Sequence, residues 1–252
     1  MKIRSGLARQ WGLLRSVMMY HAIPFRRRQL TRFYAQFIGP GDVCFDIGAH
    51  VGSRLRAWAP LNARIIAVEP QPDCMALLRR WFGQQSRIIL IEQAVGAAPG
   101  VAELWVSSRT PTVTTLSPTW IEAVCQERGF ATVRWNEQVL VTVTTLDELI
   151  ARYGLPAFCK IDVEGYELDV LKGLSQAIPA LSFEYLPACL EAARDCIAQL
   201  ARLGAYQFNW SVGEAQRLRS DRWLDADAMY ARLDRFTPAE GSGDIYARLP
   251  KA

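Results

Sequence analysis

The sequence predicts an α/β fold, a doubly wound parallel sheet covered by helices on both faces. From Asp42 onward, short β-like runs alternate with helical stretches, which is the pattern of a parallel sheet. Glycines follow the first run where a helix should begin, and Glu69 ends the second run. The 252 residues, half of them hydrophobic, are enough for one globular domain with a sizeable core.

The predicted elements follow one another along the whole chain. Strands are expected at residues 43–45, 64–68, 87–92, 157–161, 181–185, 206–211 and 244–249, and helices at 50–59, 73–82, 167–173 and 189–203. Two more β-like runs, 102–106 and 138–144, flank a Thr-rich stretch, residues 107–137, with a helix expected at 118–128. Thr145 and Glu148 have capping-box spacing and predict a helix that ends near Tyr153.

Residues 1–40 are expected to form a basic helical extension of the domain formed by residues 41–252. Residues 1–41 carry eight Lys and Arg side chains and no acid, whereas the rest of the chain carries 21 basic and 25 acidic side chains. Apolar residues recur at helical spacing on both sides of Pro24, which predicts two amphipathic helices. These helices either pack on the domain with their arginines in solvent, the commoner case, or contact an anionic membrane surface or substrate.

We expect the protein to be cytoplasmic. No uncharged apolar run approaches the roughly 20 residues that span a bilayer. Arg9 and Arg15 interrupt any signal-peptide core. The six cysteines form no C-x-x-C pair and have no nearby histidine at zinc spacing, so we expect reduced thiols that are mostly buried.

The turn after the first strand indicates a cofactor site. Asp46, Gly48 and Gly52 follow the spacing D-x-G-x-x-x-G, in which an aspartate replaces the first glycine of a dinucleotide fingerprint. A carboxylate is a poor neighbour for a pyrophosphate but a good one for a cationic ligand. The turn therefore suits S-adenosylmethionine, which has an ammonium and a sulfonium group and no phosphate. The alternative is a structural turn with Asp46 as a cap.

Two later strand ends add candidates for cofactor binding. Glu69 lies 21 residues beyond Gly48, where an acid in a nucleotide-binding sheet accepts hydrogen bonds from ribose hydroxyls. Gln93 and Ala94 follow the third strand and would lie beside an adenine edge. That assignment is weaker, since a polar loop residue needs no ligand.

Acidic residues at the next two strand ends are the candidates for catalysis. Strand alternation places Lys160, Asp162 and Glu164 on one side, with the two acids at the carboxyl edge beside the cofactor crevice. They could act as a general base, anchor a substrate hydroxyl or ligate a hard cation, although the sequence does not itself indicate a metal. The structural alternative is that Asp162 caps a helix and Glu164 pairs with a cation. Glu184 and Tyr185 are expected substrate contacts.

Four segments in this order resemble the FkbM family of S-adenosylmethionine-dependent methyltransferases. They are residues 46–52, 68–70, 145–149 and 160–165 with 171–173, within a match over roughly residues 41–187. The resemblance implies a class I, Rossmann-like methyltransferase fold, with a seven-stranded, mostly parallel sheet and one antiparallel strand. It places Asp46, Gly48 and Gly52, with Ala49 in the same turn, around the methionine part. It places Glu69 at the ribose, and Gln93 and Ala94 at the adenine.

The resemblance implies O-methylation of a sugar, glycan or secondary metabolite. We expect in-line displacement, with Asp162 or Glu164 as the base and His50 as a packing residue beside the cofactor. Residues 107–137 lie outside the family signatures and are expected to form part of the acceptor pocket or a lid. The alternatives are an NAD-linked oxidoreductase, which conflicts with Asp46, a nucleic-acid methyltransferase and a membrane-binding scaffold without catalysis. A nucleic-acid partner is not expected, because the basic segment lacks interleaved stacking aromatics.

Overall fold

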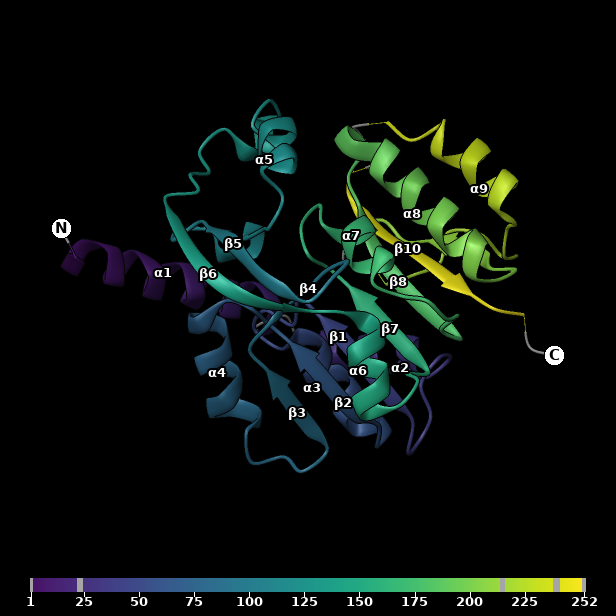
Figure 1. The fold of residues 1–252 in the computed structure, drawn as a ribbon, viewed down its shortest axis with the longest axis horizontal. Helices are drawn as coiled ribbons and strands as arrows, with labels where there is room; N and C mark the ends of the chain where they lie inside the picture. The colour runs from purple at the N-terminus through teal and green to yellow at the C-terminus, as the bar shows by residue number, and fades with distance from the viewer. Residues whose placement is uncertain (1, 22–24, 214–215, 238–240, 251–252) are drawn as a thin grey trace.

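The computed structural model describes residues 2–21, 25–213, 216–237 and 241–250 (Figure 1). Its main sheet has seven strands in the order β3-β2-β1-β7-β8-β10-β9. Among the described strands of this sheet, β10 alone runs in the opposite direction to the rest, and the mostly parallel sheet confirms the predicted α/β class. The strands are β1 (Val43–Ile47), β2 (Arg64–Val68), β3 (Ile88–Ile91), β7 (Phe158–Ile161), β8 (Ala180–Tyr185), β9 (Gln207–Trp210) and β10 (Gly243–Arg248).

The strand order creates a crevice between β1 and β7. The chain builds the sheet outward from β1 through β2 to β3, and then returns to place β7 on the other side of β1. At such a switch point the connections leave the carboxyl ends of the two central strands in opposite directions. The predicted cofactor turn at the end of β1 and the predicted acidic residues after β7 therefore meet at one edge of the sheet.

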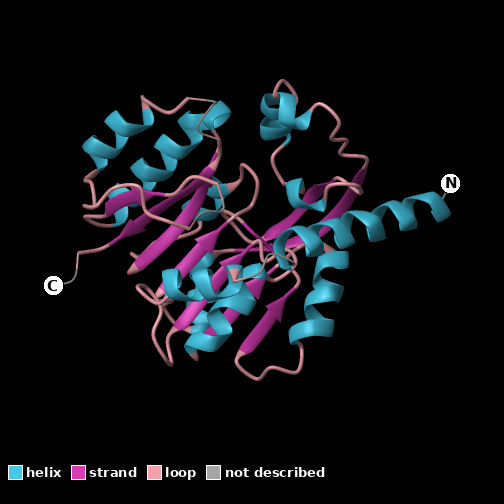
Figure 2. Ribbon diagram, turned by 180° about the vertical axis from the view of Figure 1, so that it is seen from behind, coloured by secondary structure: helices cyan, strands magenta, loops and turns pink. Residues whose placement is uncertain are grey.

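Helices cover both faces of the sheet, as Figure 1 and Figure 2 show from opposite sides. Alternate residues of β1 point to different cores: Phe45 and Ile47 belong to one buried cluster, and Cys44 to the other. The first cluster includes residues of α6 (Leu146–Tyr153), α7 (Glu167–Lys172), α8 (Leu190–Leu203) and α9 (Ala226–Leu233). The second includes residues of α2 (Arg26–Tyr34), α3 (Ser53–Trp58) and α4 (Pro72–Phe82).

The two N-terminal helices make different contacts. In α2, Leu30 and Tyr34 are buried in the second cluster, and the Tyr34 ring lies 5.4 Å from that of Phe158. Helix α1 (Lys2–His21) instead packs on α4 and on the 3₁₀ turn Pro111–Val113. In the part of the chain that is described, no helix has both the length and the apolar character needed to cross a membrane. The division expected at Pro24 lies outside the described residues.

The two β-like runs flanking residues 107–137 form a separate small sheet. β5 (Gly100–Val106) pairs antiparallel with β6 (Glu137–Thr144), and β6 pairs parallel with the short strand β4 (Ala94–Val95). The β5–β6 connection contains α5 (Pro118–Val124). Buried side chains of Val113, Trp120, Val124 and Val133 give this connection a hydrophobic cluster of its own.

Several predicted boundaries were wrong for local reasons. The helix expected at 50–59 begins at Ser53, because His50 and Gly52 have left-handed backbones with φ of 48° and 77°. The helix expected at 118–128 ends at Val124, and α9 was not predicted. Thr145 caps α6 as predicted by accepting a hydrogen bond from the Glu148 amide, but the Glu148 carboxylate bonds to the Thr144 hydroxyl instead of completing the box.

The turn after β1 depends on close contact with the end of β7. Gly48 has φ of +83°, and a side chain there would place Cβ 1.9 Å from the Asp162 carbonyl oxygen. The Gly48 amide donates to Val68 O at 2.9 Å, and the Asp162 amide donates to Ile47 O at 3.0 Å. The glycine thus brings three strand ends together, so it is needed for packing of the chain itself and not only for access to a ligand.

Substitution of Gly48 should therefore lower the free energy of unfolding by far more than left-handed backbone strain alone would. Gly41 is the matched control, because its φ is +85° and a Cβ would have open space around it. We expect Gly41→Ala to lower the free energy of unfolding by about 1 kcal/mol. Gly48→Ala should lower it by about 4 kcal/mol or prevent folding. Urea unfolding measures both, and equal losses would contradict a steric role for Gly48.

Candidate active site

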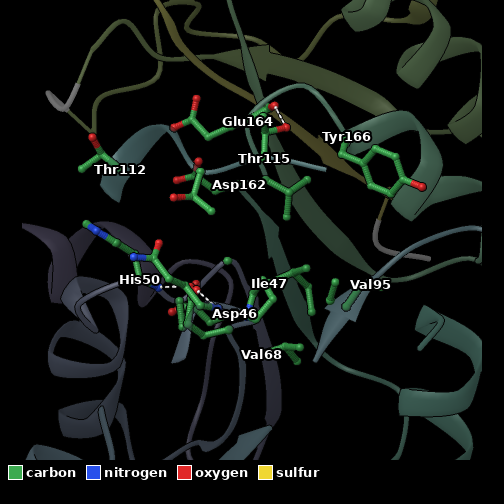
Figure 3. Close-up of a pocket in the computed structure, with 18 of the residues that line it drawn as sticks. Asp46, Ile47, His50, Val68, Val95, Thr112, Thr115, Asp162, Glu164 and Tyr166 are labelled. Carbon is green, nitrogen blue, oxygen red and sulfur yellow. Dashed lines mark hydrogen bonds between the residues drawn. The ribbon is translucent and has the colours of Figure 1, made fainter. Parts of the chain in front are cut away.

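A cavity opens at the carboxyl edge of the main sheet (Figure 3). Its empty volume is about 1050 Å³, including the open mouth. The ends of β1, β2, β7 and β8 line it, together with β4, the β5–β6 connection and Tyr20 of α1. Two groups of acidic residues face this space: Asp46 and Glu69 on one side, and Asp162, Glu164 and Glu184 on the other.

Asp46 is a buried carboxylate that needs a donor. Its side chain is 1% exposed, and neither carboxylate oxygen has a hydrogen-bond partner among the described residues. Burial raises its pKa to about 6, against the opposing effect of Lys160 and Arg54. A buried acceptor without a donor is costly, so its position on the cavity wall fits a ligand that brings a cationic donor.

Glu69 is oriented by backbone amides. One carboxylate oxygen accepts from the Gln71 amide at 2.8 Å, and the other accepts from the His50 amide at 2.7 Å. Each oxygen keeps further acceptor capacity, which suits the two hydroxyls of a ribose. Burial raises the pKa of Glu69 to about 7, and the two amides oppose this effect.

The other predicted cofactor residues are not all at the cavity. Gly48, Ala49, Gln93 and Ala94 line it, although Ala94 lies in β4 and not in the expected loop. Gly52 is not among the lining residues, and the space where its side chain would be is filled by Phe82 and Leu78 of α4.

Asp162, Glu164 and Glu184 form a carboxylate cluster at the ends of β7 and β8. One oxygen from each lies within 4.8 Å of the others. Burial raises the pKa of Glu164 and Glu184 well above the usual range, and repulsion by Asp162 and Glu167 adds to this effect. Such a cluster can hold and transfer protons, and its three oxygens are also a donor set that suits a divalent cation such as Mg²⁺.

Lys160 keeps one member of the carboxylate cluster ionised. Its side chain is 2% exposed, and its ammonium pairs with Asp162 and lies 3.8 Å from a carboxylate oxygen of Asp244 of β10. Burial alone would raise the pKa of Asp162, but Lys160 lowers it below the usual value. The strand alternation of Lys160 and Asp162 was visible in the sequence, whereas the approach of Asp244 depends on the pairing of β10 with β8.

The β5–β6 connection holds the loop that carries Glu164. The Thr115 hydroxyl donates to the Glu164 carbonyl at 2.7 Å. Gly165 lies so close to Trp120 of α5 that a Cβ would come 2.1 Å from the indole. Glu164 itself has a left-handed backbone with φ of 54°, so these contacts maintain a conformation that its sequence does not favour.

Of the two aromatic residues His50 and Tyr185, only His50 lies at this cavity. His50 lines the cavity, and its ring makes an edge contact with Tyr20 of α1 at 5.8 Å. Tyr185 does not line this cavity; its ring packs 4.9 Å from Phe236, and it is 2% exposed. It borders an adjoining cavity that shares Glu184 with the first. Tyr20 was not among the predicted site residues, and its position depends on how α1 packs.

Removal of Lys160 should destabilise the fold, because the buried carboxylate of Asp244 and the half-buried carboxylate of Asp162 would lose the positive charge of the lysine. We expect Lys160→Met to lower the free energy of unfolding by about 3–5 kcal/mol. The double variant Lys160→Met/Asp244→Asn should lose less free energy of unfolding than its two single variants lose together. The reason is that the second substitution removes one of the unpaired charges. Lys172→Met is the control, since Lys172 pairs with Asp169 at the surface and should cost less than about 1 kcal/mol. Additive losses in chemical unfolding would show that Lys160 and Asp244 are not coupled.

The chain was compared with known families and proteins. Residues 46–198 match the methyltransferase FkbM domain. Hexuronic acid methyltransferase AglP of Haloferax volcanii is 26% identical over 147 residues, covering 56% of this chain and 54% of that protein. The chain thus spans about half the length of this curated relative.

Two solved methyltransferase structures illustrate the structural similarity. One is an O-methyltransferase from Bacillus cereus in complex with SAH, with a TM-score of 0.48, 10% identity and coverage of 98% of this chain and 90% of that one. The other is precorrin-6y C5,15-methyltransferase from Geobacter metallireducens, with a TM-score of 0.45, 12% identity and coverage of 89% and 87%.

Proposed function

Because the chain belongs to the FkbM family of S-adenosylmethionine-dependent methyltransferases, we propose that it methylates a hydroxyl group of a sugar, glycan or secondary metabolite. The observation that carries this proposal is the arrangement of acids around one cavity. Asp46, buried and without a donor in the described part of the chain, lies on one side, and the carboxylate cluster lies on the other. A cationic methyl donor and a hydroxyl acceptor would each find matching groups there.

The proposed cofactor site uses residues of three strand ends. Asp46 binds the ammonium of the methionine part beside Gly48 and Ala49, and Glu69 accepts hydrogen bonds from the ribose hydroxyls. Gln93 and Ala94 lie at the adenine edge. The fit rests on the charge of Asp46, because its oxygens lack donors within the described chain. When bound, S-adenosylmethionine supplies a methyl group on a sulfonium, which is already a good leaving group.

The carboxylate cluster then handles the acceptor proton. Asp162, held ionised by Lys160, accepts a hydrogen bond from the acceptor hydroxyl and orients its oxygen. Glu164, once ionised, is the stronger base of the two because its pKa is raised. One of these two carboxylates would take the proton of the acceptor hydroxyl, and the bound cofactor would supply the methyl group to that oxygen. Glu184 provides a further acceptor for substrate hydroxyls, and a divalent cation on the cluster would be an alternative way to lower the hydroxyl pKa.

The acceptor is proposed to be a neutral hydroxyl compound. The relative AglP is named a hexuronic acid methyltransferase, which supports the sugar class. In this chain three carboxyl groups lie on the acceptor side, and Asp162, which stays ionised, would repel a free uronate or the phosphates of a nucleic acid. Thr112, Thr114 and Thr115 also line this side, so we propose that residues 107–137 form part of the acceptor pocket.

We propose the cytoplasm as the place of action. All six cysteines are free thiols in the structure, and four of them are buried. This state suits a reducing compartment.

Cofactor binding should depend on the ionisation of Asp46. Asp46→Asn should weaken S-adenosylmethionine binding roughly ten- to a hundredfold, since a buried charge-assisted contact contributes on the order of 1.5–3 kcal/mol. In the parent protein the affinity should rise from pH 5 to pH 8, because Asp46, with a pKa of about 6, loses its proton across this range. Calorimetry measures both effects.

Two further variants check the assignment of the cofactor site. Glu69→Gln should also weaken binding, whereas Asp221→Asn, an exposed substitution away from the cavity, should not. Unchanged affinity in Asp46→Asn and Glu69→Gln, or an equally steep pH profile in Asp46→Asn, would contradict the proposed site.

Asp162→Asn and Glu164→Gln test the proton step. If either carboxylate is the base, its variant should lose roughly two to four powers of ten in turnover with nearly normal cofactor affinity. The assay is mass spectrometry of hydroxylated acceptors incubated with labelled cofactor, with Asp169→Asn on α7 as the control. Loss of activity on chelation, restored by Mg²⁺ or Mn²⁺, would assign the cluster to a metal ion instead. Full metal-free activity of both variants would exclude these carboxylates from the mechanism.

A further inference from the structure

Helix α1 has four large apolar side chains on the outside. Trp11, Leu14 and Met18, at positions i, i+3 and i+7, are 70%, 49% and 62% exposed. Met19 is 44% exposed. We call these four residues the outer face of α1. A surface helix normally turns such a stripe toward the core, so an outward stripe indicates that something else covers it.

The inner face of α1 carries small and polar residues beside the half-buried Leu13, Val17 and Tyr20. Ser16 is only 2% exposed, and Gly12 lies against the backbone of Ser108. Arg9 pairs with Asp73 of α4 at 3.6 Å and with Glu137 of β6. These contacts hold α1 in one orientation about its own axis. The helix therefore cannot rotate to bury its outer face.

Positive charge surrounds the outer face. Arg15 is exposed within the stripe. Phe25, 77% exposed, begins the next segment, and Arg27 and Arg28 are exposed in the first turn of α2. The two helices meet closely, because the Arg26 guanidinium lies 5.4 Å from the Tyr20 ring and donates to Met19 O at 3.4 Å. Residues 1–41 contain no acid that would neutralise these arginines.

We propose that α1 lies in the interface of an anionic membrane. Its outer face and Phe25 would enter the boundary between headgroups and acyl chains, while Arg15, Arg27 and Arg28 contact lipid phosphates. Apolar side chains bordered by arginines match a bilayer, which offers hydrocarbon and negative charge side by side. The same face of a second copy would bring like charges together.

This docking would place the cavity at the membrane. Tyr20, at the C-terminal end of α1, lines the cavity, and α1 also packs on Pro111–Val113, where Pro111 lines it too. The N-terminal part of α1 projects beyond the rest of the fold in both views (Figure 1, Figure 2). The proposal concerns the surface alone and does not depend on methyl transfer.

Vesicle sedimentation with the full chain tests the proposal. The probes are phosphatidylcholine vesicles with and without phosphatidylglycerol. The parent protein should sediment with the anionic vesicles only, and less strongly as salt is raised. Trp11→Gln/Met18→Gln should reduce partitioning at least tenfold. Arg27→Gln/Arg28→Gln should reduce it about fivefold for each arginine.

Two matched controls separate this effect from general changes of the surface. Leu140→Gln removes a side chain that is 71% exposed on β6, and Arg222→Gln removes an exposed charge near the C-terminus. Both should bind vesicles like the parent protein. The melting temperature should stay the same in all four variants, because the changed side chains are exposed.

Three results would overturn the proposal. The first is that the parent protein binds neither kind of vesicle. The second is equal binding to neutral and anionic vesicles. The third is a dimer in sedimentation velocity that Trp11→Gln/Met18→Gln converts to monomer while vesicles remain unbound, since the outer face would then be covered by a second copy.

Discussion

The buried ammonium of Lys160 is the charge on which the carboxyl edge of the sheet depends. It lies in β7 at the centre of the sheet, opposite Asp46 on one side and Ser182 on the other. Burial opposes its positive charge, but Asp162 and Asp244 raise its pKa so that it stays protonated. It thereby permits several acids to gather at one edge, which would otherwise be prohibitive in a low-dielectric interior.

The same charge divides the acids into different chemical states. Asp162 is paired with Lys160 and ionises readily, whereas Glu164 and Glu184 keep their protons to higher pH. Neighbouring carboxyls with separated pKa values are suited to accept and hold a proton during a reaction. Burial raises the pKa of Asp46 to about 6, so its charge can respond to a cationic ligand.

The site also depends on a segment outside the main sheet. Thr115 and Trp120 hold the loop at Glu164 and Gly165, so the β5–β6 connection both borders the cavity and fixes one of its acids. Changes in this connection would alter acceptor contacts and the carboxylate cluster together. Helix α1 closes another side through Tyr20, which links the cavity to the outer surface of the N-terminal segment.

Patterns within the sequence were enough to predict the α/β class, the bounds of β2 and the cap of α6. They also predicted five acidic candidates that line the cavity: Asp46, Glu69, Asp162, Glu164 and Glu184. These follow from local rules, because hydrophobic periodicity, capping residues and the parallel-strand edge act over a few residues. Four other features became visible in the folded chain: β5 and β6 form a separate sheet, Asp244 approaches Lys160, Tyr185 packs against Phe236, and α1 turns an apolar stripe outward. Each of these depends on contacts between segments far apart in the chain. Such contacts are selected by the packing of the whole fold, which local preferences do not encode.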